Sequence, residues 1–243
     1  EDLSQGGLVF TGYPSTCDVT VLARTEPVPD IGTVRLRLHF TGSHGLTAES
    51  APTDERLQLG LDQLTEIYAT AGVGVEIVGY EDVPGVAEDP TLTDVGSTAG
   101  LPNDLSKLFL AGHDEDPATL NVFFVSSIYK DLDYEEVGGT VLGIAGGVPG
   151  PAFLGAGYRS GVAIATFEIG EDDHLGSVIA HEVGHYLGLF HSTEKEAIFH
   201  DTLDDTGESD PANLMFWGWS VDGVGLSEAQ GYVLRSHPMV SPD

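Results

Sequence analysis

The sequence contains little cysteine, little positive charge and no long uninterrupted apolar run. Cys17 is its single cysteine, so no internal disulfide can form. Nine Lys and Arg residues stand against 39 Asp and Glu, and the resulting net charge of −30 argues against nucleic acid or an anionic membrane as partner. The longest uncharged stretch, residues 137–158, is broken by glycines and prolines, so we expect no membrane span.

The remaining composition is that of a folded, very acidic domain. Hydrophobic residues make up 41% of the 243 positions, which is enough for a sizeable core. The acidic excess predicts a very soluble protein, adapted to salt or able to bind calcium. No basic and apolar leader precedes the polar N-terminal residues, so we expect a signal peptide to be absent here or removed.

The stretch HEVGHYLGLFH, residues 181–191, is the most informative part of the sequence. Apolar residues recur at helical spacing beside it and predict a half-buried helix. On that helix His181 and His185 lie on one face, about 5.4 Å apart along the axis. Two imidazoles so placed can both reach one zinc ion at roughly 2.0–2.1 Å. Glu182 can instead accept a proton from the attacking water, which is the general-base role in metal-assisted hydrolysis.

The second half of the stretch predicts a third ligand. On a continuous helix His191 would lie about 15 Å beyond His181. Gly188 can adopt a positive φ, end the helix and return the chain toward the metal. The alternative, histidines satisfied within the core on a helix face, explains neither the glycine nor the third histidine. We therefore predict one catalytic zinc ion, Zn2+, held by His181, His185 and His191.

This eleven-residue pattern resembles that of the metzincin clan of zinc endopeptidases, in which a methionine-bearing turn lies beneath the metal. Met215, in NLMFW at 213–217, follows His191 by 24 residues and matches such a turn. Residues 201–215 look most like the pappalysin branch. The resemblance implies a protein or peptide substrate and a secreted or extracellular protein, free or anchored to a surface. We expect it to act as a monomer.

The rest of the chain predicts an α+β fold. The resemblance implies a metzincin-like catalytic domain with a twisted mixed five-stranded sheet, a backing helix, the zinc helix and a C-terminal helix. We expect an N-terminal extension or pro-segment remnant at 1–30 and the catalytic domain at 31–243. Predicted strands occupy 17–24, 33–40, 73–80, 119–128, 140–147 and 160–169. Predicted helices occupy 51–72 with Thr53 as cap, 101–112 with Asn103, a zinc helix from Asp172 or Asp173, and 226–238 with Ser227.

One segment has two interpretations. In metzincins the strand at 140–147 would be the antiparallel edge strand that pairs with the substrate backbone, and its glycines would allow another chain to approach closely. The alternative is a flexible loop.

Two further sites are open at this stage. The acidic loop after the motif offers oxygen ligands for calcium, Ca2+, at Asp201, Asp204, Asp205 and Asp210, although such loops are often only solvated. Cys17 resembles the cysteine that keeps some metzincins latent by capping the zinc, since a thiolate is a good zinc ligand. The alternative interpretation is that Cys17 is a small, buried hydrophobic residue.

Two alternatives to an endopeptidase are also open. One is a zinc-bearing pseudoprotease or surface binding module, against which the intact Glu182 argues. The other is a zinc amidase acting on a peptidoglycan crosslink.

Overall fold

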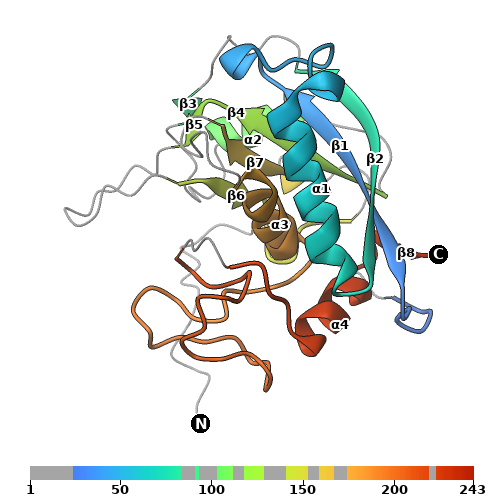
Figure 1. The fold of residues 1–243 in the computed structure, drawn as a ribbon, viewed down its shortest axis with the longest axis vertical. Coiled ribbons are helices and arrows are strands. Elements are labelled where there is room, and N and C mark those ends of the chain that lie inside the picture. Colours follow the sequence, from blue (N-terminus) through green and yellow to red (C-terminus); the bar gives the residue numbers. More distant parts are fainter. Residues whose placement is uncertain are drawn as a thin grey trace, which may run out of the picture.

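A mixed β-sheet covered by helices forms the body of the protein (Figure 1). The computed structural model describes residues 24–83, 91–92, 103–111, 118–128, 141–152, 159–166, 174–218 and 223–243. The main sheet has the order β2-β1-β4-β7-β6, with β8 paired to β1. Its strands are β1 Gly32–Phe40, β2 Val73–Asp82, β4 Thr119–Val125, β6 Gly143–Ala145, β7 Val162–Ala165 and β8 Val240–Pro242. The helices are α1 Glu55–Ala69, α2 Asp104–Ala111, α3 Leu175–Tyr186 and α4 Glu228–Ser236.

The main sheet is mixed, with parallel strands at its centre and an antiparallel pairing at β6 and at β8. Strands β1, β2, β4 and β7 run parallel, whereas β6 pairs antiparallel with β7 and β8 pairs antiparallel with β1. A second, two-stranded sheet pairs β3 Thr91–Leu92 with β5 Ser127–Ile128. Helix α1 connects β1 to β2, so the predicted strand–helix–strand unit with a parallel pair is confirmed.

The sheet is covered on both faces. Val34, Leu36 and Leu38 of β1 are fully buried against α1 and α3, as the alternation in the sequence predicts. On the opposite face, Phe123 and Val125 of β4 pack with α2, whose Phe109 is fully buried. Because every residue of β4 is buried, this strand is the centre of the core, and its near-continuous apolar run reflects that position.

Helix starts agree with the sequence at two of the three proposed caps. Ser106 N–H donates to Asn103 Oδ1 at 2.8 Å at the start of α2. Ser227 forms a capping box with Gln230 at α4. The prediction of Thr53 for α1 is wrong, because the Asp54 side chain accepts from Leu57 N–H at 2.8 Å while Thr53 ends a preceding 3₁₀ turn.

The final strand was not predicted. Residues after α4 return to the sheet as β8, a sixth strand beside the five of the main order. Arg24 donates to the carbonyls of His237 and Val240, and Arg235 Nε donates to Pro29 O at 3.0 Å. Residues 24–30 are thereby fixed to the C-terminal end of the chain. None of the helices in the described ranges combines the length and apolar character that a bilayer span requires.

Helix α3 lies against α1 at a point where both carry glycine. A Cβ on Gly176 would lie 2.3 Å from Gly60 O, so only hydrogen at this position permits the contact. Gln63 Oε1 of α1 also accepts from Ser177 N–H at 3.1 Å, which satisfies a donor in the first turn of α3. The position of α3 in the domain therefore depends on this close approach.

Replacing Gly176 by alanine should destabilise the fold, although alanine is the better helix former by about 1 kcal/mol. The new Cβ would meet both Gly60 O and, at 2.7 Å, Gln63 Cβ, so α1 and α3 would have to separate. We expect the free energy of unfolding to fall by about 1–3 kcal/mol in urea denaturation. Gly218→Ala is the control, since its Cβ would meet nothing closer than Phe216 Cε1 at 3.5 Å. An equal loss in both variants would contradict the packing argument.

Candidate metal site

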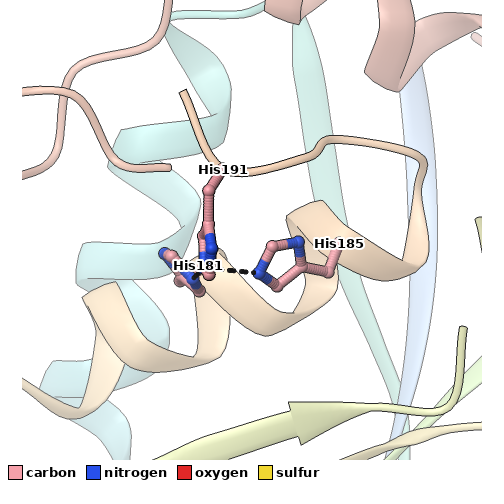
Figure 2. Close-up of side chains that lie close together, drawn as sticks. All are labelled: His181, His185 and His191. Carbon is pink, nitrogen blue, oxygen red and sulfur yellow. Dashed lines mark hydrogen bonds between the residues drawn. The ribbon is translucent and has the colours of Figure 1, made fainter. Parts of the chain in front are cut away.

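Helix α3 and the segment after it bring the three predicted histidines together (Figure 2). His181 and His185 lie one turn apart on α3, and the chain reverses at Gly188, whose φ is 110°. Leu189 N–H closes the reversal by donating to Gly184 O at 2.9 Å. As a result, His191 Nε2 lies 3.2 Å from His181 Nε2 and 3.2 Å from His185 Nε2.

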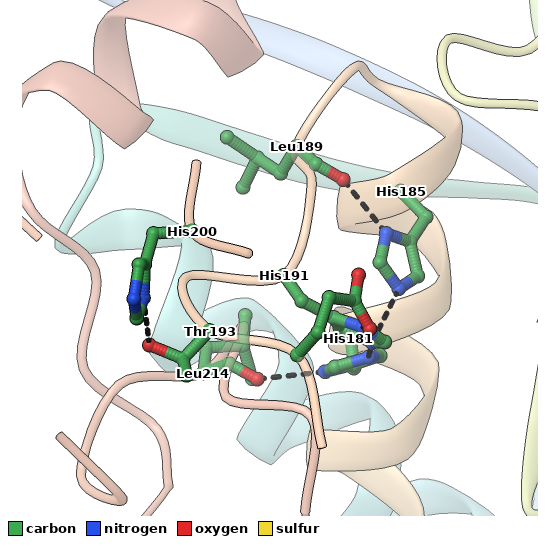
Figure 3. A network of polar contacts seen from close by, with 8 residues as sticks. His181, His185, Leu189, His191, Thr193, His200 and Leu214 are labelled. Atoms are coloured by element: carbon green, nitrogen blue, oxygen red, sulfur yellow. Dashed lines mark hydrogen bonds and ion pairs between the residues drawn. The ribbon is translucent and has the colours of Figure 1, made fainter. Parts of the chain in front are cut away.

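A hydrogen bond fixes the orientation of each imidazole. His181 Nδ1–H donates to Leu214 O and His185 Nδ1–H donates to Leu189 O, both at 2.7 Å (Figure 3). His191 Nδ1–H donates to Glu194 Oε2 at 3.0 Å. With hydrogen on Nδ1, each Nε2 carries a lone pair, so the facing nitrogens cannot donate to one another.

These three lone pairs fit a zinc ion. Two nitrogens at 2.0–2.1 Å from a tetrahedral zinc would be about 3.3 Å apart, close to the separations observed here. Burial and the neighbouring His185 lower the pKa of His181 to about 3, and burial and His191 lower that of His185 to about 4. Both rings are therefore neutral at pH 7 and can act as ligands. Among the residues that the structure describes, this is the one cluster of three metal-ligating side chains found.

Met215 lies against helix α3. Its side chain is fully buried, and a Cβ on Gly184 would lie 3.0 Å from Met215 Sδ, so a glycine between the two α3 histidines permits this contact. Met215 O accepts from Ser192 N–H at 2.8 Å, next to His191. Asn213 Oδ1 accepts from Met215 N–H at 2.8 Å, and the Asn213 amide pairs with Gln230 of α4. The methionine turn thus links the ligand segment to the C-terminal helix.

Glu182 is buried under strand β6. Burial raises the pKa of its carboxyl group to about 8, partly offset by a hydrogen bond that the Ala145 N–H donates. A Cβ on Gly143 would lie 2.4 Å from Glu182 Cγ, so the glycine at this position allows the strand to lie over the carboxylate. The predicted antiparallel strand at 140–147 is present over Gly143–Ala145 as β6, where it ends the main sheet order.

Glu194 is the site residue that sequence reasoning missed. The sequence suggests only an acidic loop, whereas the structure places this carboxylate on the third predicted ligand. A signal was available, because metal-bound histidines almost always donate their second N–H to an oxygen acceptor. A carboxylate three residues after His191 was a candidate for that acceptor.

Three of the four aspartates proposed for calcium accept local hydrogen bonds. Asp201 Oδ1 accepts from Leu203 N–H and Thr206 Oγ1, and Asp210 Oδ1 accepts from Ala212 N–H. The Asp205 carboxylate accepts from Ser227 Oγ and Ala229 N–H at the start of α4, and these bonds lower its pKa. Asp204 is exposed. Calcium binding stays a prediction, and Cys17 lies outside the described residues.

A family model and two solved structures are similar to this chain. The family model described as matrixin matches residues 106–214, which include β4, β7 and all of α3. A crystal structure of metalloproteinase-II from Bacteroides fragilis is 14% identical with a TM-score of 0.47, covering 87% of this chain and 54% of that one, so this chain spans about half its length. A zinc-dependent peptidase from Methanocorpusculum labreanum is 14% identical with a TM-score of 0.40, covering 78% and 91%. No curated protein sequence matches.

The matrixin match runs through all three histidines and supports a zinc metalloprotease of the metzincin type. The metzincin resemblance and the α+β fold predicted from the sequence are confirmed at this level. Assignment to the pappalysin branch stays a prediction.

Substituting one ligand should remove most of the metal. We expect His185→Ala to lose most bound zinc, because two imidazoles alone cannot complete a stable site. Zinc per chain, measured by atomic emission after dialysis, tests this. His44→Asn is the control: His44 is exposed, lies in the Ser43–Gly45 turn and has a φ of 54°, which asparagine tolerates. Full zinc stoichiometry in His185→Ala would rule out the proposed ligand set.

Proposed function

We propose that this chain is an endopeptidase that hydrolyses peptide bonds with one zinc ion and with Glu182 as general base. The observation that carries the proposal is the position of Glu182, buried beneath an edge strand and next to a ligand on the same helix. A carboxylate used only for solubility would lie in water. Its burial needs a reason, and proton transfer at a metal site is one.

A zinc ion held by His181, His185 and His191 would polarise the scissile carbonyl and acidify the attacking water. Glu182 then accepts the proton of that water and delivers it to the leaving amine. Burial raises the pKa of Glu182 to about 8, and a nearby divalent cation would draw that value downward, toward the range in which the carboxylate is ionised at neutral pH. The Ala145 N–H, which donates to the carboxylate, favours the same ionised form.

Strand β6 is suited to hold the substrate backbone. It pairs with β7 along one edge, and the part of the chain that the structure describes adds no further strand of the main sheet beyond it. An extended peptide could pair with the other edge, which is a general mode of peptide capture. Such pairing would bring the scissile bond toward Glu182, because Gly143 of this strand lies against that side chain.

The proposed substrate class rests on the hydrolytic chemistry of the site, and the proposed location rests on the resemblance to metzincins. We propose a protein or peptide substrate, a monomeric enzyme, and a location outside the cell. A binding module without turnover, or a zinc amidase acting on peptidoglycan, would use the same ligands.

Replacing Glu182 by glutamine should abolish cleavage and preserve zinc. Glutamine keeps the shape and can still accept from Ala145 N–H, but it cannot take the proton, so we expect kcat to fall at least about 10²–10⁴-fold. Digestion of an unfolded protein and zinc content are measured on both forms. Cleavage by the variant at the wild-type rate would exclude Glu182 as the base. Zinc binding without cleavage by the wild type would favour the binding module, and cleavage of a peptidoglycan crosslink alone would favour the amidase.

Replacing Gly143 by alanine should impair the same step through geometry. The added Cβ would lie 2.4 Å from Glu182 Cγ and must displace either β6 or the carboxylate. We expect kcat to fall at least about tenfold, because a small misplacement of a catalytic group reduces the rate on this scale. The zinc content should be unchanged. Ile144→Val is the control, because Ile144 packs with the cluster on the other face of the sheet. Equal activity in Gly143→Ala and wild type would contradict a role for this contact.

A further inference from the structure

The three predicted zinc ligands differ in the group that accepts a hydrogen bond from their Nδ1–H. His181 and His185 donate to backbone carbonyls, of Leu214 and Leu189 respectively. His191 donates instead to a side-chain carboxylate, that of Glu194 at 3.0 Å. A carbonyl is a neutral acceptor, whereas a carboxylate adds a negative charge to the hydrogen bond and strengthens it. The third predicted ligand is therefore the one whose Nδ1–H donates to a charged acceptor.

The turn after His191 holds that carboxylate in place. Glu194 N–H donates to Phe199 O, and Ala197 N–H donates to Glu194 O, both at 2.9 Å. Thr193 forms antiparallel and parallel bridges with His200 and Phe216, and its Oγ1 donates to Glu208 O at 2.6 Å. His200 Nδ1 lies 3.1 Å from the same hydroxyl (Figure 3). Glu194 is thus set on a turn with fixed ends.

The charge of Glu194 also suits a dication. Histidine ligands bring no negative charge to a metal ion, whereas the carboxyl groups of Glu182 and Glu194, which lie beside or touch these ligands, supply two negative charges once both are ionised. Together they would balance a bound Zn2+. The Glu194 side chain is 44% exposed, so water and salt reduce its effect below that of a buried carboxylate.

We propose that Glu194 is a positioning residue that orients His191 through its Nδ1–H and strengthens zinc binding. Orientation comes from the hydrogen bond, and added ligand basicity comes from the charge. The inference rests on the proposed zinc site but not on peptide hydrolysis, so it can be tested without measuring cleavage.

The test compares zinc affinity in the wild type, Glu194→Gln and Glu194→Ala by competition with a chelator of known affinity. Glutamine keeps an acceptor oxygen without the charge, so we expect about tenfold weaker binding, whereas alanine removes both and should weaken binding by up to about 100-fold. Glu196→Gln is the matched control, because it removes one exposed carboxylate from the same turn. The control should bind zinc as the wild type does.

A second readout separates positioning from general damage to the fold. Cobalt can replace zinc in such sites, and its visible absorption reports ligand geometry. We expect the cobalt spectrum to change in Glu194→Ala while the thermal midpoint of the metal-free chain stays that of the wild type. A metal-free midpoint that falls in step with affinity would overturn the positioning role.

The outcomes separate this inference from the proposed function. If the wild type binds zinc and cleaves protein, but Glu194→Gln binds zinc within twofold of it, the role of Glu194 is wrong and the endopeptidase stands. A Glu196→Gln affinity as weak as that of Glu194→Gln would also overturn the role, because the effect would then be one of bulk charge. If the wild type binds no zinc, both proposals fail.

Discussion

Three imidazole lone pairs directed at one point form the constraint on which this structure depends. Nitrogens 3.2 Å apart, each with hydrogen on the other ring atom, repel unless a cation lies between them. The fold holds them there with three hydrogen bonds, two to backbone carbonyls and one to Glu194. Because Leu214 O belongs to the methionine turn, the ligand geometry requires the helix, the return segment and that turn to be formed together.

Small residues around α3 make this assembly possible. Gly176 permits the contact with α1, Gly184 the contact with Met215, and Gly143 the approach of β6 to Glu182. Each is a position where a single methyl group would meet another atom at 3.0 Å or less. Close contacts on three sides therefore fix the position of helix α3. Hydrophobic burial alone would determine less precisely how deep the helix lies in the domain and how it is rotated about its axis. That precision matters for Glu182 as the proposed general base, because a general base must lie within hydrogen-bond reach of the proton it takes.

The sequence predicted those features in which a pattern and its physical cause are local. The motif at 181–191 predicted both the helix and the reversal at Gly188, and strict alternation predicted β1. The choice of Asp54 over Thr53 as cap depended on where a short 3₁₀ turn ends, which no periodicity reveals. Strand β8 could not be read from its three residues, since its pairing partner lies some 200 residues away in sequence. The position of Glu194 three residues after His191 made it a candidate, but several other acidic residues lie nearby in the sequence, and the fold was needed to choose among them.

The scarcity of cations in this chain bears directly on the metal site. Three of its six arginines, Arg24, Arg56 and Arg235, donate to backbone carbonyls and so stabilise connections between distant segments. The ion pairs found in the described ranges that use Lys or Arg lie on β1–β2 and α2, away from the histidines. No lysine or arginine among them neutralises Glu182 or Glu194. A bound dication is therefore the charge that best compensates these two carboxylates, and without it the buried Glu182, whose pKa burial raises to about 8, would be largely protonated at neutral pH. Both the excess of acidic residues over the whole chain and the two carboxylates at the site therefore favour the binding of a cation.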